Sequence, residues 1–292
     1  HFEVGVFTNL TQDHLDYHKT MENYYQAKRM MFDECDDAII NMDDEYGKRL
    51  YDEIKCRKYT CGIGNTADFY ADNISIRADG TEFDYYYNGK SAHIVTQMIG
   101  MFNVFNVMAA ISVCLKIGLE INDILKALKE YKGVKGRCEI IPTGKDFTVI
   151  CDYAHTPDAI ENILSSVKEY TSGDLICLFG CGGNRDSKKR PLMAKAAAKY
   201  ADRLIITSDN PRDEIPEAII DDILAGLTDK EIPFDVVVDR TEAIYHSLKI
   251  AQKGDIIVLA GKGHEDYQVL SGNEHIHFDE REIVSEGLKL IN

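Results

Sequence analysis

The sequence lacks long hydrophobic runs, paired cysteines and an excess of positive charge, and each absence excludes a class of protein. No run approaches the length of a membrane-spanning helix and no charged-then-apolar leader opens the chain, so we expect a cytoplasmic protein without membrane insertion. The eight cysteines form no CxxC pair and no metal-ligand spacing, which indicates reduced thiols. The formal net charge of −16 argues against nucleic acid as a partner, because binding it needs a basic face.

The length of 292 residues favours two domains. The polar, glycine-containing segment 132–137 is the predicted boundary, so we expect domains at 1–133 and 134–292. Beyond it, strand and helix patterns alternate through residue 290, which is typical of a doubly wound parallel sheet in an α/β fold. The chain starts at His1, without Met and inside a predicted strand, so we expect it to be the C-terminal part of a longer protein.

The first domain is predicted to mix strands and helices. The pattern predicts strands at 2–8 and 37–42, a loop and an amphipathic helix within 14–32, and helices at 103–119 and 121–131, with Gly118 as a C-cap. Residues 57–97 alternate polar and apolar in short stretches, and Gly80 and the pair 88–89 mark turns. This segment is therefore predicted to be an antiparallel hairpin region.

Four segments of the second domain share one form, a short apolar run that ends abruptly in a polar loop. They are residues 147–157, 175–186, 204–212 and 256–265. In an open parallel sheet, ligands bind in the crevice beyond the carboxyl ends of the strands. The sequence therefore predicts that the four loops converge on one site.

The loop Ser208-Asp-Asn-Pro-Arg-Asp-Glu214 carries a cation where a helix is expected to begin. Pro211 suits the first turn of a helix, and Asp209 or Asn210 could cap it. Capping does not explain Arg212, because a cation near a helix N-terminus opposes the helix dipole. We expect this guanidinium to bind a carboxylate or phosphate in bidentate fashion.

The loop Gly180-Cys-Gly-Gly-Asn-Arg-Asp186 has glycines that would let the backbone approach a ligand, although a tight strand-to-helix turn is the simpler explanation. Its spacing differs from the GxGxxG dinucleotide fingerprint, which excludes a dehydrogenase. Arg185 at its tip favours carboxylate binding. The neighbouring cations Lys188, Lys189 and Arg190 could recruit an anion or form a solvated helix start.

The loop Gly261-Lys-Gly-His-Glu265 would suit an ammonium group, through a backbone carbonyl and the Glu265 carboxylate. Taken alone, a solvated loop is the favoured interpretation. Together with arginines for carboxylates, however, the pair Gly261 and Glu265 indicates a free amino acid that is held at both ends.

Two clusters in the first domain leave more than one interpretation open. Thr11-Gln-Asp-His-Leu-Asp-Tyr-His18 holds two His and two Asp, which suits a metal ion or simple capping. Asn103 and Asn106 lie three residues apart, on one side of a predicted helix start. Their amides could read a purine edge, although capping by Asn103 is also possible.

The motifs taken together resemble those of the Mur ligases of peptidoglycan synthesis, and within them the members that add the third peptide residue to UDP-N-acetylmuramoyl-L-alanyl-D-glutamate. The resemblance runs from Asn9–His18 to Gly261–Glu265 through Phe102-Asn-Val-Phe-Asn106, Gly136-Arg137, Asp152-Tyr-Ala-His-Thr-Pro157 and the two loops described above. It implies the C-terminal part of a P-loop-type ATPase central domain, followed by a Rossmann-like doubly wound parallel-sheet domain. We also expect a monomer.

The resemblance also implies a role for each matching residue. Residues expected to contact meso-diaminopimelate are Arg185, Asp209, Asn210, Pro211, Arg212, Gly261 and Glu265. For ATP, Asn103 and Asn106 are expected to read adenine, Asp152 the ribose, and Arg137 and His155 the phosphate region. His14 and Lys28, the latter as a carbamate, are expected to serve Mg²⁺, and Arg137, His155 and Lys28 are the implied catalytic residues.

The implied reaction is amide formation through an acyl phosphate on the D-glutamyl side chain, at the expense of ATP. No GxxxxGK[ST] loop occurs in the sequence, so we expect this chain alone to lack ligase activity but to retain weak amino-acid binding. The alternatives are a lysine-adding ligase of the same family and a non-catalytic amino-acid-binding module. Folylpolyglutamate synthetase is disfavoured, because we expect it to lack the Asp-Asn-Pro-Arg signature.

Overall fold

The computed structural model describes residues 1–11, 15–64, 66–77, 80–227 and 232–291. The chain forms two compact units, His1–Lys132 and Gly133–Asn292, each with its own six-stranded sheet. None of the helices in the described ranges combines the length and the hydropathy that crossing a bilayer requires.

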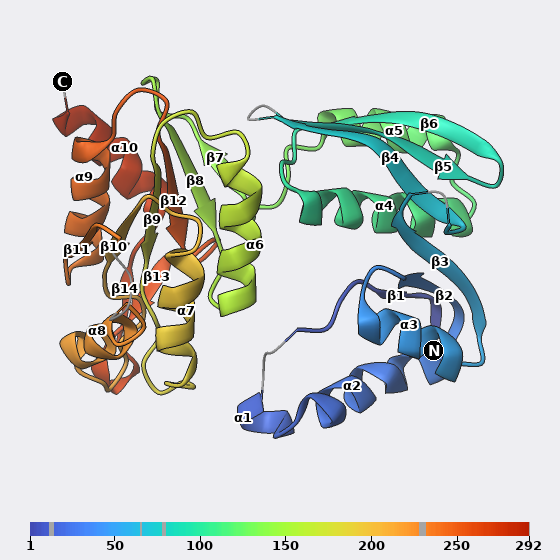
Figure 1. The fold of residues 1–292 in the computed structure, drawn as a ribbon, viewed down its shortest axis with the longest axis horizontal. Coiled ribbons are helices and arrows are strands. Elements are labelled where there is room, and N and C mark those ends of the chain that lie inside the picture. Colours follow the sequence, from blue (N-terminus) through green and yellow to red (C-terminus); the bar gives the residue numbers. More distant parts are fainter. Residues whose placement is uncertain (12–14, 65, 78–79, 228–231, 292) are drawn as a thin grey trace. The chain divides into compact units, whose positions relative to one another are not determined.

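The first unit is built on a mixed sheet with the strand order β1-β2-β3-β4-β5-β6 (Figure 1). Strands β1 to β4 are parallel to one another, whereas β4, β5 and β6 are antiparallel. The strands are β1 (Phe2–Phe7), β2 (Cys35–Asn41), β3 (Arg57–Ile63), β4 (Phe69–Arg77), β5 (Gly80–Tyr87) and β6 (Lys90–Thr96).

The predicted hairpin region at 57–97 is correct for β4 to β6 and wrong for β3. Strand β3 pairs in parallel with both β2 and β4. Alternation of polar and apolar residues determines which face each side chain takes, but it carries no information about the direction of the neighbouring strand. The turn at Asn88 and Gly89 is confirmed, since both residues have positive φ and Tyr87 pairs with Lys90 across it.

The described part of the first unit also contains five α-helices and one 3₁₀ turn. They are α1 (Leu15–His18), α2 (Met21–Arg29), the 3₁₀ turn η1 (Met30–Glu34), α3 (Glu45–Glu53), α4 (Met101–Lys116) and α5 (Ile121–Glu130). Helix α4 packs on β1 to β4 through residues at helical spacing, namely Val104, Val107, Met108 and Ile111. Gly118 follows the helix with φ of 91°, and Leu119 N–H donates to the Cys114 carbonyl at 2.9 Å, so the expected C-cap is confirmed.

The second unit is a doubly wound sheet with the strand order β11-β10-β9-β12-β8-β7. All pairs are parallel except the antiparallel edge pair of β7 with β8. The strands are β7 (Glu139–Ile141), β8 (Thr148–Asp152), β9 (Leu175–Phe179), β10 (Arg203–Ile206), β11 (Phe234–Val236) and β12 (Ile256–Ala260). The sequence prediction of an α/β fold with a doubly wound sheet is therefore confirmed.

Helices lie on both faces of this sheet (Figure 1). They are α6 (Pro157–Lys168), α7 (Lys189–Ala197), α8 (Pro216–Leu224), α9 (Arg240–Ile250) and α10 (Glu280–Leu290). Helices α9 and α10 bury one face, against alternate strand residues such as Val149, Cys151, Ile176 and Leu178. A small hairpin of β13 (Tyr267–Val269) and β14 (His275–His277), with the turn η2 (Ser271–Asn273), precedes α10.

Candidate active site

The four polar loops predicted from the sequence leave the sheet side by side. They follow β8, β9, β10 and β12, which are consecutive neighbours in the order β10-β9-β12-β8. The last residues of these strands are in register, because Ala260 pairs with both Asp152 and Phe179, and Phe179 pairs with Ile206. The loops therefore share the carboxyl edge of the sheet, where open α/β sheets bind ligands.

The loop after β10 is held by the amide of Asn210, which is buried. Its Oδ1 accepts hydrogen bonds from Lys262 Nζ and from the Val269 backbone N–H, both at 2.9 Å. Its Nδ2 donates to Glu265 Oε2 at 3.1 Å. Both ends of the amide are thus used, and they connect the loop after β10 to the loop after β12.

The predicted helix start at Pro211 is wrong. Helix α8 begins at Pro216, with Ile215 as its N-cap, so Asp209 to Arg212 lies in a loop, which turns at residues 212–213. The segment contains two prolines, either of which suits a first helical turn, and the second one takes that position. The argument that Arg212 opposes a helix dipole consequently does not apply.

Arg212 and Arg185 flank the same glycine. A Cβ atom at Gly182 would lie 2.9 Å from Arg212 Nη1 and 3.7 Å from Arg185 Cγ. Arg212 has a φ of 51°, and its Nη1 donates to the carbonyls of Gly183 at 3.0 Å and Asn210 at 3.4 Å. Arg185 is exposed and bonds only the neighbouring Asn184 carbonyl, at 3.3 Å, among the residues described. Both guanidinium groups therefore keep donors for a ligand.

The loop after β12 contains a lysine whose position the sequence did not reveal. Lys262 is fully buried and donates to Glu265 Oε2 at 2.8 Å. The Glu265 side chain is 14% exposed, and its Oε1 makes no hydrogen bond within the described part of the chain. A ligand ammonium would meet Oε1, since Oε2 is already shared by Lys262 and Asn210.

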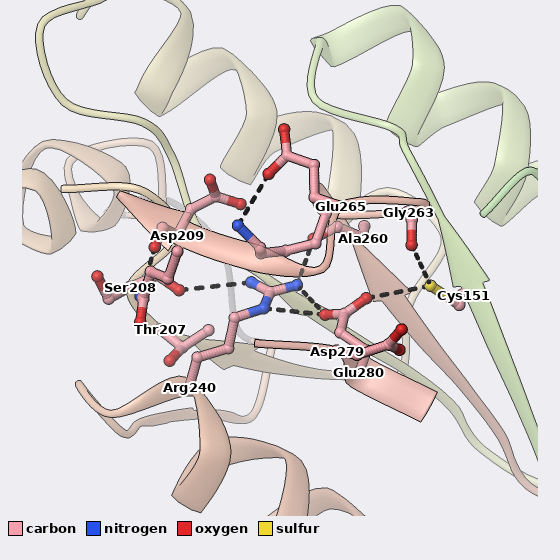
Figure 2. A network of polar contacts seen from close by, with 12 residues as sticks. Cys151, Thr207, Ser208, Asp209, Arg240, Ala260, Gly263, Glu265, Asp279 and Glu280 are labelled. Atoms are coloured by element: carbon pink, nitrogen blue, oxygen red, sulfur yellow. Dashed lines mark hydrogen bonds and ion pairs between the residues drawn. The ribbon is translucent and has the colours of Figure 1, made fainter. Parts of the chain in front are cut away.

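Gly261 and Asp209 are in close contact across the same two loops. Gly261 has a φ of 119°, and a Cβ atom there would lie 2.8 Å from Asp209 Oδ2. Asp209 Oδ1 accepts the N–H of Asn210 at 2.7 Å. Figure 2 shows Asp209 and Glu265 on the loops that follow β10 and β12. A side chain at position 261 would displace the Asp209 carboxylate, so only glycine suits this position.

A second cluster forms around the ring of Tyr153, which sequence reasoning did not single out. The Arg137 guanidinium carbon lies 4.7 Å from the ring centroid, and the rings of His155 and His264 lie at 4.7 and 5.0 Å. Two of the expected phosphate-region residues, Arg137 and His155, are thereby brought together. His264 belongs to the Gly261–Glu265 loop, so it links this cluster to the residues around Asn210 and Glu265.

Asp152 ends β8 and organises the backbone around this cluster. Its two carboxylate oxygens accept the N–H groups of Cys138 at 2.6 Å and Ala154 at 2.8 Å. Burial raises the pKa of the Asp152 carboxyl, although these two hydrogen bonds oppose the shift. The residue is 8% exposed, so any ribose contact would use the remaining lone pairs of a carboxylate that already accepts two backbone N–H groups.

The basic group near α7 does not act as one anion site. Arg190 is buried and pairs with Glu214 and Asp222, each at 2.9 Å. Lys189 donates to the His155 carbonyl at 3.0 Å. Of the four cations in the predicted group, Arg185 and Lys188 are the exposed ones.

The predicted residues of the first unit lie on α2 and α4. Asn103 is buried and donates to the Ile99 carbonyl at 2.9 Å, while its Oδ1 accepts from Asn106 Nδ2 at 3.3 Å. Asn106 is exposed and keeps its own amide oxygen for a ligand. Lys28 is exposed, with Nζ 5.1 Å from the centroid of the Tyr24 ring. His14 lies outside the described residues.

Metal ligands are not assembled in the described ranges. No group of three or more His, Cys, Asp or Glu side chains in them could hold a metal ion. His18, from the predicted metal cluster, stacks on the Tyr24 ring with centroids 4.7 Å apart. Residues 12–14 of that cluster lie outside the described part of the chain.

Two known domain families match the chain. Residues 136–263 match the family described as "Mur ligase, glutamate ligase domain", and residues 1–114 match "Mur ligase middle domain". The chain belongs to the Mur ligase family. The resemblance inferred from its loops is therefore confirmed at the level of the family.

The similar curated proteins share a name. The chain is 48% identical over 290 residues to "UDP-N-acetylmuramoyl-L-alanyl-D-glutamate--2,6-diaminopimelate ligase 1" of Clostridium acetobutylicum, covering 99% of this chain and 60% of that protein. It is 44% identical over 296 residues to the Bacillus cereus protein of the same name without the numeral, covering 98% and 60%. The chain thus spans about 60% of the length of these relatives.

Solved structures agree with this placement. One titled as the structure of UDP-N-acetylmuramoyl-L-alanyl-D-glutamate--2,6-diaminopimelate ligase matches with a TM-score of 0.65 and 35% identity, covering 99% of this chain and 60% of that one. A pseudomurein peptide ligase type C from Methanothermus fervidus matches with a TM-score of 0.74 at 18% identity, covering 97% and 63%. At that identity, the second match shows a common fold.

Proposed function

We propose that this chain is part of an ATP-dependent ligase that joins meso-diaminopimelate to UDP-N-acetylmuramoyl-L-alanyl-D-glutamate in peptidoglycan precursor synthesis. The names of its relatives support this proposal. The observation that carries it is the loop cluster at the carboxyl edge of the second sheet, where Arg185 and Arg212 flank Gly182 and Asn210 bonds Glu265. That set of charges suits a zwitterion with an additional carboxylate.

The proposed binding mode assigns each end of the amino acid to one part of the cluster. Arg185 and Arg212 bind the carboxylate of the end that does not react, through charge-assisted hydrogen bonds. Glu265 Oε1 accepts the ammonium at that end, next to Asp209. Lysine lacks this carboxylate and would leave the guanidinium donors unpaired, and sites built for a polar group can reject such analogues by roughly ten-thousand-fold.

The proposed reaction proceeds through an acyl phosphate. The γ-phosphoryl group of ATP is transferred to the D-glutamyl side-chain carboxylate, which gives ADP. The neutral amine of diaminopimelate then attacks the acyl carbon, the tetrahedral intermediate expels phosphate, and the nitrogen loses its extra proton. Arg137 and His155 are proposed to stabilise the negative charge on the phosphoryl group.

His155 is suited to this task by its hydrogen bonds. Its Nδ1 lies 2.8 Å from the Tyr153 carbonyl, and because a carbonyl only accepts, Nδ1 carries the hydrogen. Nε2 is therefore the ring atom that can accept a hydrogen bond or take up a proton. Tyr153 orients both His155 and Arg137.

ATP and Mg²⁺ are proposed as further partners. Asn103, Asn106 and Asp152 are proposed to contact the nucleoside of ATP. Mg²⁺ would neutralise phosphate charge, with His14 and a carbamate on Lys28 among its ligands. The described residues do not by themselves form a magnesium site, so no step is assigned to it. We further propose a monomer that acts in the cytoplasm.

The proposal is tested by ligation and binding. Ligation is assayed with the product of the whole reading frame that carries this chain, using the UDP-dipeptide, ATP and either meso-diaminopimelate or lysine. Phosphate release and the mass of the product are measured. We expect diaminopimelate to be added and lysine to be rejected; addition of lysine instead would identify the other ligase of this family.

Calorimetric titration of the chain tests the binding site directly. We expect it to bind meso-diaminopimelate more tightly than lysine and to show no ligase activity. If the whole product binds diaminopimelate but neither binds nor hydrolyses ATP, the protein is an amino-acid-binding module and the ligase proposal is wrong.

A further inference from the structure

An ion pair lies fully inside the second unit, directly beneath the candidate site (Figure 2). Arg240 is the first residue of α9 and Glu280 is the first residue of α10, and both side chains are 0% exposed. Arg240 donates to Glu280 Oε1 from Nη2 at 2.7 Å and from Nε at 3.0 Å. Because removing two charges from water is costly, a buried ion pair is often no more stable than an apolar pair of similar size. Stability alone is a weak explanation for this pair.

The remaining bonds of the guanidinium point to another role. Nη2 also donates to the Ala260 carbonyl at 2.9 Å, and Nη1 donates to the Ser208 carbonyl at 3.4 Å. Ala260 directly precedes Gly261, and Ser208 directly precedes Asp209. Ala260 is the last residue of β12 and Ser208 lies just after β10. These two strands are not neighbours, since β9 separates them in the sheet. Arg240 therefore connects two loops that the hydrogen bonds between strands do not connect directly.

The carboxylate of the pair extends the connection to a third point. Glu280 Oε2 lies 3.1 Å from Cys151 Sγ, and that sulfur lies 3.3 Å from the Gly263 carbonyl. Gly263 also accepts a hydrogen bond from Arg281 Nη2 at 2.9 Å. The loop that carries Glu265 is thus held at its start, where Arg240 bonds the Ala260 carbonyl. It is held again in its middle, where Cys151 and Arg281 bond the Gly263 carbonyl.

We propose that Arg240 is a positioning residue for amino-acid binding, which sets the spacing between the loop of Asp209 and the loop of Glu265. This inference rests on the proposed function of the same site. The Arg240 side chain is 0% exposed, so it acts through the Ser208 and Ala260 carbonyls and does not touch the ligand. Glu280 holds the guanidinium in the orientation that reaches both carbonyls.

The decisive variant removes the connection while keeping the core filled. In R240M/E280L, apolar side chains of similar length replace both charges, and such replacements commonly preserve or raise stability. A purely structural ion pair predicts that this variant binds normally. A positioning role predicts that this variant binds meso-diaminopimelate roughly tenfold more weakly or worse, as expected when binding groups shift by a fraction of an ångström. It also predicts that the variant melts at the wild-type temperature or above.

A conservative variant and a matched control complete the test. R240K keeps the charge opposite Glu280, but one ammonium cannot span both carbonyls, so we expect an intermediate loss of affinity. R203M/D235L removes the pair of Arg203 Nη1 with Asp235 Oδ2, 2.9 Å apart, which joins β10 to β11 away from the loops. We expect the control to bind diaminopimelate like the wild type.

Calorimetric titration of the full chain gives the affinities, and scanning calorimetry gives the melting temperatures. In the product of the whole reading frame, the KM for diaminopimelate should rise while the KM for ATP stays unchanged. Wild-type affinity in R240M/E280L would overturn the positioning role; if that variant does not fold, wild-type affinity in R240K would do so. If the wild-type chain itself binds no diaminopimelate, the proposed function is contradicted, whatever the role of Arg240.

Discussion

Removing either partner of the Lys262–Glu265 pair should destabilise the second unit unequally, because the two side chains are buried to different extents. Lys262 is fully buried, whereas the Glu265 side chain is 14% exposed. The variant E265A leaves a buried ammonium with one hydrogen bond, to Asn210 Oδ1 at 2.9 Å, and with the ring centroids of Tyr267 and Phe278 at 5.6 and 5.7 Å. Breaking a buried pair in this way costs about 3–5 kcal/mol of unfolding free energy.

The variant K262M should cost less. The carboxylate that remains reaches water and still accepts the Asn210 amide at 3.1 Å. Asn210 Oδ1 also keeps a donor, the Val269 N–H at 2.9 Å, so no buried acceptor is left unpaired. K262M removes two hydrogen bonds of the ammonium, to Glu265 Oε2 and to Asn210 Oδ1. Because both acceptors keep another donor and no charge is left buried, the loss is about 1–3 kcal/mol. E265A is therefore expected to be the less stable of the two by about 2 kcal/mol.

Urea titrations at pH 7, followed by circular dichroism and checked by scanning calorimetry, measure both losses. The matched control is the pair of Lys48 with Glu45, which has the same two residue types three positions apart at 2.6 Å, but with side chains 49% and 85% exposed. We expect K48M and E45A to leave the unfolding free energy unchanged within error, since exposed pairs contribute little. The reasoning is refuted if K262M costs as much as E265A or if the surface pair matters equally.

Three further predictions concern other parts of the second unit. G182A should weaken diaminopimelate binding by roughly tenfold with little loss of stability, because the one close contact of the added Cβ is with the flexible end of Arg212, at 2.9 Å, and its other neighbours lie at 3.7 Å or more; unchanged affinity in a calorimetric titration would contradict this. Burial raises the pKa of Glu139, but hydrogen bonds from Arg281 and a backbone amide outweigh it and leave the pKa below its ordinary value of 4.5. The stability from this depressed pKa is present above pH 4.5 and is lost as pH falls through the folded-state pKa, so E139Q should flatten the acid limb of the melting-temperature profile; an equally steep limb would be the contrary result. Burial raises the pKa of Cys177 to about 12, so mass spectrometry should find it unalkylated at pH 8 in the native chain and alkylated in urea.

The four strand ends could be predicted because their signal is local. Each strand contains three to five consecutive apolar residues, all of them buried, and is followed by a loop of polar residues and glycines. Parallel strands place such loops at one edge of a sheet whatever the strand order. The sequence thus contained the residues that the structure brings together around Gly182 and Asn210.

The supporting residues could not be predicted, because their signal is not local. Arg240 and Glu280 each open a helix and lie 31 and 71 residues beyond Asp209, where a charged residue usually means a solvated helix end. Lys262 lies between two glycines, a sequence that is typical of a lysine in an exposed loop, although the structure buries it fully. Residue type alone does not reveal burial, and the pairing that makes the burial tolerable depends on the tertiary structure.

The buried basic side chains have a common role in this sheet. In the described ranges they are Arg190, Arg240 and Lys262, and each bonds at least one loop of the candidate site: Arg190 the Gly182 carbonyl at 3.3 Å, Arg240 the carbonyls before two loops, and Lys262 the Asn210 amide. Since each is also paired with a carboxylate, it is electrostatically balanced before a ligand binds. Arg185 and Arg212, whose recorded bonds are to backbone carbonyls, are not balanced in this way. In the proposed binding mode, a ligand carboxylate therefore gains most from these two arginines. We expect changes of amino-acid specificity to arise at them, and changes at the buried cations to weaken every ligand alike.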